Sequence, residues 1–167
     1  MPNSPILDLS TIDRTQVVVD RAELDKYLAQ RGTFSVIDHL VHADKESAIM
    51  VGVKAIREDD WWAADHIPGR PMFPGALMIE TAAQIASYDY SKNRILSDDD
   101  NRFVGFGGVE KCRFRGIVAP PSNLYLCVKL ERSSSRMFRY QAEGYIERDG
   151  ELQAKRVFEA TVLGVLF

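Results

Sequence analysis

Apolar and polar residues alternate along most of the second half of the chain. In residues 124–130 every second residue is leucine or valine, which predicts a strand with one apolar face. Residues 138–146 alternate in the same way, and Asp149-Gly150 then gives the signal of a type I′ hairpin turn before the next run. The second half is therefore predicted to be an antiparallel meander.

The first half contains a different pattern, in which apolar residues point in every direction. It predicts one long buried helix, opened by Pro74 and Gly75 and ending near Tyr90. An N-capping pattern before it predicts a short helix over residues 21–31. Two β-rich runs follow that short helix, at residues 34–41 and 48–56. One long helix beside five or six antiparallel strands predicts an α+β domain in which the sheet wraps the helix.

The length and composition fit a single domain over residues 1–167, with residues 1–20 as an N-terminal extension. The start of the chain lacks a basic region followed by an apolar core. No apolar run approaches the ~20 residues that span a bilayer, so we expect a cytoplasmic protein without membrane contact. Cys112 and Cys127 lack metal-ligand spacing and are expected to be buried free thiols.

The charges are unevenly distributed. The net charge of −3 argues against a nucleic-acid partner, yet residues 111–139 hold seven basic residues and a single acid. Such a stretch can attract an acidic partner whatever the overall charge, although it can also form the solvated outer faces of strands. The basic residues are Lys111, Arg113, Arg115, Lys129, Arg132, Arg136 and Arg139.

The segment HIPGRPMFPGALMIETAAQ, residues 66–84, joins a proline-rich loop to the long helix. Each proline fixes its own φ and holds the preceding residue extended, so the loop is expected to be rigid. Gly69 permits a backbone conformation that a side chain would forbid. Gly75 lies where the free N–H groups of a helix start can receive a carbonyl oxygen or an oxyanion, although an ordinary N-terminal glycine would look the same.

Two ionisable residues of this segment are candidates for acid–base chemistry. Glu80 is expected to be buried or nearly so, and a buried carboxylic acid can keep its proton and serve as a general acid. Gln84, one turn later, could orient that carboxyl or a water, unless Glu80 is a structural acid held by backbone donors. His66 suits a general base. His39 and His42 are expected on opposite sides of a strand, so no metal site is predicted.

The order of these residues resembles a known family. The pattern His66-x-Pro68-Gly69-x-Pro71-x-x-Pro74-Gly75, followed by Glu80-x-x-Ala83-Gln84, is similar to the signature of the 3-hydroxyacyl-acyl carrier protein dehydratases of fatty-acid synthesis, which have the hot-dog fold. The segments QRGTFSVIDHLV and VEKCRFRGIVAPP also fall in the expected order, so the resemblance extends from about residue 20 to the C-terminus. A glutamate at position 80 resembles the general elongation enzymes rather than the relative that also isomerises the double bond.

The resemblance implies an activity. The enzyme would remove water from a (3R)-3-hydroxyacyl thioester to give a trans-2-enoyl thioester, without a metal or other cofactor. His66 would take the proton next to the thioester carbonyl, Glu80 would protonate the leaving hydroxyl, and the Gly75 N–H would hold the carbonyl. Phe103 and Phe106 match an aromatic region that lines the acyl tunnel in relatives, with core packing as the alternative.

The resemblance also implies partners. Members of the family form homodimers whose site combines the histidine loop of one subunit with the helix acid of the other, and some associate into hexamers as trimers of dimers. We therefore expect at least a homodimer. The family's substrate arrives on the phosphopantetheine arm of an acidic acyl carrier protein, which Arg136, together with Arg113, Arg115 and Arg139, is expected to dock.

Some positions depart from the family pattern. Asp65 stands where a glycine commonly precedes the histidine, Ile67 replaces a common phenylalanine, and Pro121-Ser122 replaces a common Gly-Asp. A carboxylate beside His66 could weaken it as a base. Two other functions stay open on the sequence: an acyl-thioesterase on the same fold, and a non-catalytic module that binds acyl chains or carrier proteins.

Overall fold

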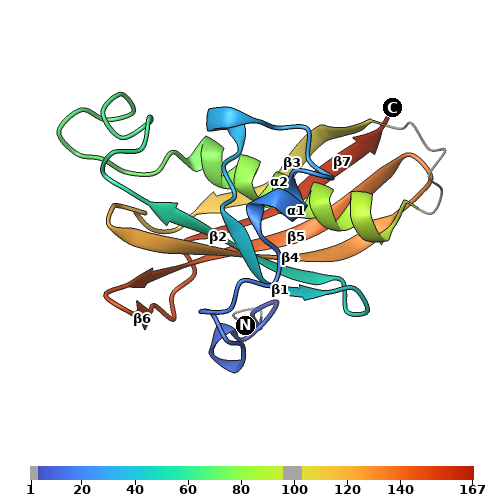
Figure 1. Cartoon of the computed structure of the whole chain (residues 1–167), viewed down its shortest axis with the longest axis horizontal. Helices are drawn as coiled ribbons and strands as arrows, with labels where there is room; N and C mark the ends of the chain where they lie inside the picture. Colours follow the sequence, from blue (N-terminus) through green and yellow to red (C-terminus); the bar gives the residue numbers. More distant parts are fainter. Residues whose placement is uncertain (1–3, 96–102) are drawn as a thin grey trace.

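The centre of the molecule is a seven-stranded antiparallel sheet (Figure 1). The computed structural model describes residues 4–95 and 103–167. The strands are β1 (His39–Asp44), β2 (Ile49–Ile56), β3 (Val104–Phe114), β4 (Ser122–Ser133), β5 (Met137–Arg148), β6 (Glu151–Leu152) and β7 (Phe158–Leu166). Helix α2 (Gly75–Asn93) lies along one face of this sheet, as Figure 1 shows. This arrangement confirms the predicted α+β fold.

The alternation along β4 decides which face each of its side chains takes. Leu124, Leu126 and Val128 belong to the core beneath α2, whereas Tyr125 and Cys127 belong to a second apolar cluster. Successive side chains of a strand point to opposite faces, so this second cluster lies on the face away from α2, here called the outer face. The predicted assignment of the β4 side chains is therefore correct.

The predicted meander is right for β4, β5 and β7 but wrong for β3. The strands lie in the order β1-β2-β4-β5-β7-β3, with β6 beside β5. After α2 the chain enters β3 at the far edge, next to β7, before it returns to the middle of the sheet in β4. Local alternation shows where the strands are, whereas strand order depends on pairings between distant segments.

The hairpin turn at Asp149-Gly150 has the predicted type. Both residues have positive φ, 53° and 79°, as a type I′ turn requires. Arg148 pairs with Glu151 across the turn. The turn thus joins β5 to the two-residue β6 rather than directly to β7.

The short helix is shorter than predicted. Helix α1 covers Arg21–Leu24, with its N-cap as expected, since the Asp20 carboxylate accepts a backbone N–H of the first turn. The Arg31 guanidinium donates to the carbonyls of Leu28 and Asp25, at 2.6 and 2.8 Å. These bonds satisfy carbonyls that are left free where the helix ends.

The strand expected over residues 34–41 also begins later, at His39. Residues Gly32–Phe34 form a 3-10 turn, η2, instead. The Phe34 carbonyl accepts a hydrogen bond from the Gln84 side chain at 2.7 Å, and the Ser35 hydroxyl donates to the Gln30 carbonyl. Contacts with a distant helix therefore decide the conformation of this segment.

The N-terminal segment, residues 4–20, is part of the packed structure. It contains the 3-10 turn η1 (Leu9–Thr11) and lies on the side of the sheet opposite α2 in Figure 1. Leu9 is buried in the outer-face cluster, and Val19 pairs with Leu40 along β1. One edge of the sheet is thus covered by the segment that precedes it, whereas β3 forms the other edge of the described sheet.

The two cysteines are free, but they are not equally buried. Cys127 is fully buried, as predicted, whereas Cys112 on β3 is only half-buried. Burial raises the pKa of both thiols, which makes them poor nucleophiles at neutral pH. Among the described residues, no helix is both long and apolar enough to cross a bilayer.

Candidate active site

The loop that carries His66 contains a type II turn at its centre. The Arg70 N–H donates to the Ile67 carbonyl at 3.0 Å, and Gly69 has a φ of +77°. A type II turn has proline at its second position and needs glycine at its third, as Pro68 and Gly69 provide. The predicted use of Gly69 is therefore confirmed, and the turn stiffens the loop.

This loop is also anchored on the body of the protein. The Phe73 N–H donates to the Val118 carbonyl at 2.7 Å. The Phe73 ring packs edge-on against Trp62, whose carbonyl accepts the backbone N–H of His66 at 2.9 Å. Both ends of the loop are thus fixed, so the position of His66 is fixed with them.

The imidazole of His66 is exposed and oriented by a single contact. Its Nδ1 lies 2.9 Å from the Met72 carbonyl oxygen. Because a carbonyl only accepts, a neutral His66 carries its proton on Nδ1. Nε2 keeps its lone pair and makes no hydrogen bond with any residue in the described part of the chain. This is the form in which an imidazole can act as a base.

Glu80 is held through one of its two carboxylate oxygens. Its Oε1 accepts a hydrogen bond from Gln84 Nε2 at 2.7 Å, and the same nitrogen donates to the Phe34 carbonyl at 2.7 Å. Both partners of the Gln84 amide are acceptors, so Nε2 must face them and the flipped orientation of the amide is excluded. Oε2 of Glu80 has no hydrogen-bond partner among residues 4–95 and 103–167.

Glu80 and Gln84 line a cavity of about 40 Å³ between α2 and the β3 edge of the sheet, together with Val104, Gly105 and Phe106. A neighbouring cavity of about 160 Å³ shares Val104 and is lined by Phe103. Core packing does not explain the two phenylalanines, because Phe103 is 59% exposed and Phe106 is 55% exposed. The structure thus brings Glu80, Gln84 and Phe106 together, with Phe103 next to them.

The prediction that α2 leaves no face for water is wrong for the single chain. Ala76 is exposed, and Ile79, Glu80, Ala83 and Ser87 are only half-buried. The sheet covers one side of the helix, and this other side borders the β3 edge. An apolar sequence does not reveal whether its own chain covers it, so Glu80 is less buried than expected.

Gly75 opens α2, as predicted, and it is also required for packing. A Cβ atom at this position would lie 2.8 Å from ring carbons of Phe114. The aromatic ring therefore closes against the first residue of the helix, which any side chain would prevent. The sequence gives no sign of this contact, since Phe114 belongs to β3.

Within the described chain, His66 and Glu80 share neither a hydrogen bond nor a cavity. His66 is not among the described residues that line the cavity of Glu80. It lies on the loop before α2, whereas Glu80 faces the β3 edge. The two halves of the expected acid–base pair are thus both present, but one chain does not bring them together.

Four arginines are predicted to dock an acidic partner. Three of them, Arg113, Arg115 and Arg139, lie on strands or at a strand end and point away from α2. Arg139 donates to Glu110 at 2.7 Å and lies 3.5 Å from Glu131. Arg115 is paired with Glu159, which lies opposite Arg113 in the sheet. Arg136 lies in the turn between β4 and β5 and has no carboxylate partner in the described residues. The basic stretch is thus partly neutralised by neighbouring acids.

The sequence analysis missed a second carboxylate in α2, Asp89. It is fully buried and accepts hydrogen bonds from the Tyr140 hydroxyl and from Asn93 Nδ2, while Arg94 Nε lies 3.4 Å away. Burial raises the pKa of the Tyr140 phenol, so it remains a donor. An asparagine four residues after an aspartate in an apolar helix is a signal that could have found this network.

An antiparallel sheet wrapped around one long helix defines the hot-dog class of proteins. The chain matches a solved dehydratase heterocomplex, ApeI:P from Xenorhabdus doucetiae, with a TM-score of 0.66 and 13% identity over 85% of this chain and 89% of that one. It also matches a thioesterase superfamily member from Thermus thermophilus, with a TM-score of 0.56 and 13% identity over 71% and 80% of the two chains. Such low identities show the fold alone.

Residues 28–158 match the FabA-like domain, so the chain belongs to the FabA-like family. It is 32% identical over 147 residues to the 3-hydroxyacyl-[acyl-carrier-protein] dehydratase FabZ of Paramagnetospirillum magneticum, across 87% of this chain and 88% of that protein. It is 26% identical over 146 residues to the FabZ of Rickettsia massiliae, across 87% and 97% of the two chains. These matches confirm the predicted family and the predicted enzyme class, a dehydratase.

Proposed function

We propose that this chain dehydrates (3R)-3-hydroxyacyl groups carried on acyl carrier protein to trans-2-enoyl groups in fatty-acid synthesis. The observation that carries the proposal is the state of Glu80 in a chain of this family. Its carboxyl is held by Gln84 through one oxygen, and the other oxygen is free beside a cavity at the edge of the chain. A carboxyl in such surroundings suits proton transfer to a bound substrate.

The reaction needs two proton transfers and no cofactor. His66 Nε2 takes the proton from C2 of the acyl chain, and the electron pair of that C–H bond forms the C2–C3 double bond. Glu80 Oε2 gives its proton to the 3-hydroxyl as the C3–O bond breaks, and water leaves. Each transfer by a positioned side chain contributes roughly 10²–10⁴-fold to the rate.

Two further groups support the reacting atoms. The Gly75 N–H, at the positive end of α2, would donate to the thioester carbonyl as negative charge develops on it. The Gln84 Oε1 atom is buried and accepts no hydrogen bond from any described residue. An unsatisfied buried acceptor is costly, so a donor such as the substrate hydroxyl or a water would be stabilised there.

A homodimer would complete the site. The β3 edge carries large exposed apolar residues, including Phe106, Val109 and Phe114, and an uncovered edge strand of this kind readily pairs with another chain. A second copy along β3 would cover the half-buried side of α2. It would also bring its own His66 loop toward Glu80 of the first copy. A closed two-fold contact forms two such sites.

The carrier protein would approach the end of the sheet where Arg136 lies. The Arg136 carbonyl accepts the Leu166 N–H at 2.9 Å, next to the strand ends that line the cavity of Glu80. Because its guanidinium has no carboxylate partner in the described residues, its charge is available to an acidic protein. Arg115 and Arg139 contribute less, since acids already neutralise them.

Turnover of 3-hydroxyacyl thioesters tests the proposal. The purified protein should form enoyl thioester from a carrier-bound substrate, and His66→Ala should abolish this activity while His42→Ala leaves it intact. Release of free thiol without enoyl product would instead identify an acyl-thioesterase. Tight binding of the acylated carrier without either product would identify a binding module.

Mixed dimers test the shared site. Co-expression of a His66→Ala chain with a Glu80→Gln chain should restore about one quarter of the wild-type activity, since about half of randomly formed dimers are mixed and each mixed dimer has one intact site. Either variant alone should be inactive. An inactive mixture that still contains mixed dimers would show that the site lies within one chain.

A further inference from the structure

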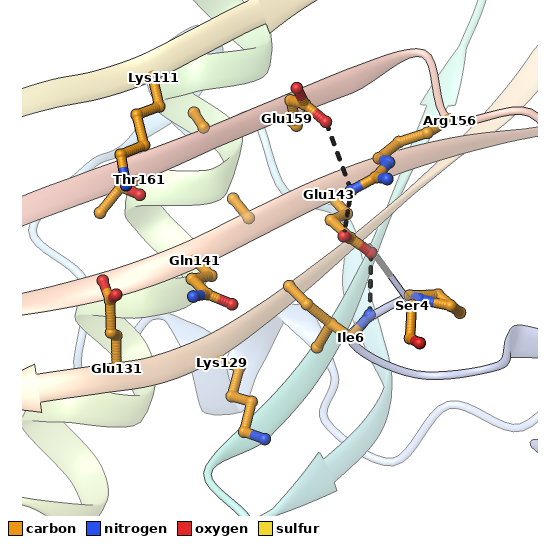
Figure 2. Close-up of a pocket in the computed structure, with 13 residues that line it drawn as sticks. Ser4, Ile6, Lys111, Lys129, Glu131, Gln141, Glu143, Arg156, Glu159 and Thr161 are labelled. Atoms are coloured by element: carbon orange, nitrogen blue, oxygen red, sulfur yellow. Dashed lines mark hydrogen bonds and ion pairs between the residues drawn. The ribbon is translucent and has the colours of Figure 1, made fainter. Parts of the chain in front are cut away.

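A polar groove of about 360 Å³ lies on the outer face of the sheet, several times larger than the cavity at Glu80. Residues 4–6 form one side of it, and strands β3, β7, β5 and β4 contribute its floor and remaining sides (Figure 2). The sheet separates this groove from α2, so it is not part of the site proposed above.

The floor of the groove is a row of polar residues at one level of the sheet. Lys129 on β4 lies opposite Gln141 on β5, which lies opposite Thr161 on β7. Lys111 extends the row onto β3. Its neighbour Glu110 pairs with Thr161, and the register of β3 shifts directly after Glu110. Figure 2 shows these four side chains on four successive strands.

The acids of the groove have arginine partners, whereas its two lysines form no ion pair in the described part of the chain. Glu143 and Glu159 are both paired with Arg156, and Glu131 lies 3.5 Å from Arg139. Lys111 and Lys129 form no ion pair with any residue in the described part of the chain. The groove therefore presents two ammonium groups without an ion-pair partner in the described residues, beside three carboxylates that have arginine partners.

Thr161 supplies a third donor from the floor of the groove. It is 6% exposed, it lines the groove, and its hydroxyl forms no hydrogen bond with another described residue. The hydroxyl is therefore free to donate to an acceptor in the groove. Gln141 beside it can donate from its amide.

The side of the groove formed by the N-terminal segment is held in place. The Glu143 carboxylate accepts the Ile6 N–H at 2.9 Å and the Tyr145 hydroxyl at 3.0 Å, and Arg156 pairs with the same carboxylate. The Ile6 side chain packs on the outer-face cluster. A site with fixed sides loses little entropy when a ligand binds.

We propose that this groove binds a small phosphorylated molecule, with the phosphate over Gln141 and Thr161 between the two lysines. Three strand spacings of ~4.8 Å place Lys111 and Lys129 about 14 Å apart at Cα, a distance that two flexible lysine side chains can close around one phosphate. A phosphate monoester places a charge of about −1.5 to −2 at pH 7 on one group, which matches two converging ammonium groups better than a single carboxylate does, and Arg156 is already engaged. The volume suits a small molecule rather than a protein surface.

Titration calorimetry with glycerol 3-phosphate tests the site. We expect saturable binding to the wild-type protein with a Kd below about 1 mM, weakened by added salt as for any exposed charge pair. The double variant Lys111→Gln/Lys129→Gln should bind at least about tenfold more weakly, because both balancing charges are removed. Thr161→Val should weaken binding by about threefold through the lost hydroxyl.

Matched measurements make the result decisive. Lys45→Gln, which removes an exposed lysine from the β1–β2 turn, should bind like the wild type. Glu80→Gln should also bind like the wild type, so the groove and the proposed dehydratase site can fail separately. Equal binding of succinate would show that the site does not select phosphate. No binding at millimolar concentration, or less than twofold weakening in the double variant, would overturn the proposal.

Discussion

Helix α2 carries two carboxylates nine residues apart whose surroundings differ. Asp89 is fully buried, and Tyr140, Asn93 and Arg94 of the same chain surround it with donors. Glu80 is half-buried and receives a single side-chain hydrogen bond, from Gln84. The first acid is satisfied by its own fold, whereas one oxygen of the second has no partner among residues 4–95 and 103–167.

This difference is what we expect between a structural acid and the proposed catalytic one. A buried carboxylate that is fully hydrogen-bonded stabilises the packing around it and cannot reach a ligand. A carboxylate that is held through one oxygen keeps its orientation and can still exchange a proton through the other. Burial alone would select Asp89, whereas our proposal selects Glu80 for its oxygen without a partner in the described residues.

The largest expected effect comes from Glu80→Gln. The amide has nearly the same shape and can still accept from Gln84, but it cannot donate an acidic proton. We expect turnover of 3-hydroxyacyl thioester to fall by roughly 10³-fold or more. The free energy of unfolding should change by less than about 0.5 kcal/mol. Steady-state kinetics and urea unfolding measure the two effects, and retained turnover would contradict the assignment of Glu80 as the acid.

Asp89→Asn should lower stability and largely preserve activity, the reverse of Glu80→Gln. It leaves Arg94 without its charge partner and disrupts a buried network, so we expect a loss of about 3 kcal/mol in the free energy of unfolding. Activity per folded molecule should remain within a few-fold of the wild type. Urea unfolding followed by circular dichroism measures the stability.

Tyr140→Phe is the matched control for this network. It removes one donor to Asp89 but keeps the ring, so we expect a smaller loss of about 2 kcal/mol. If Asp89→Asn abolished turnover without lowering stability, the distinction between the two acids would be wrong.

The sequence predicts most of the elements because their patterns are local. Alternation identifies β4 and β5 and the face of each β4 side chain, and the apolar run identifies α2. The order of the strands could not be predicted, because β3 pairs with β7, which lies some fifty residues later. The early end of α1 was not predicted either, and the bonds from Arg31 to backbone carbonyls after the helix leave no periodic signal.

The candidate site is predictable where spacing alone decides a contact. Glu80 and Gln84 are four residues apart on one helix and do form a hydrogen bond. The donor to Asp89 comes from Tyr140, 51 residues away, so that network escapes a local reading. The arginine pairs are equally non-local, since Arg115 pairs with an acid on β7 and Arg139 with an acid on β3, two strands away from its own. The partial exposure of Glu80 depends on which segments cover α2. A pattern of apolar residues does not predict those segments.

A smaller effect is expected from Gln84→Met, which keeps the size of the side chain and removes its amide. Glu80 would lose the bond that orients it, and the Phe34 carbonyl would lose a donor. We expect kcat to fall about tenfold with KM nearly unchanged, as for a residue that positions a catalytic group. A purely structural role for Gln84 would lower stability and leave kcat per folded molecule unchanged.

The smallest effect should come from a third acid that contacts α2, Glu23. Its carboxylate accepts from Lys26 and from Lys92 of α2, both at 2.7 Å, and these bonds lower its pKa from the ordinary 4.5 to about 2. A lowered pKa means that its stabilising contribution is complete above pH 4.5 and is lost as the pH falls toward 2. The contribution is small because water screens this exposed pair.

Glu23→Gln should therefore lower the urea midpoint slightly at pH 6 and less at pH 3, where Glu23 of the unfolded wild-type chain is already protonated and part of the contribution is lost. Glu46→Gln, in the exposed β1–β2 turn, is the control and should show no such pH-dependent difference. If the decrease in urea midpoint caused by Glu23→Gln became larger as the pH fell, the Lys92 contact would not act through the charge of Glu23. Glu23 would then join α2 to α1 by packing alone, unlike Asp89, which is held by hydrogen bonds. Both oxygens of Glu23 accept hydrogen bonds, so it lacks the unpartnered oxygen that suits Glu80 for proton transfer.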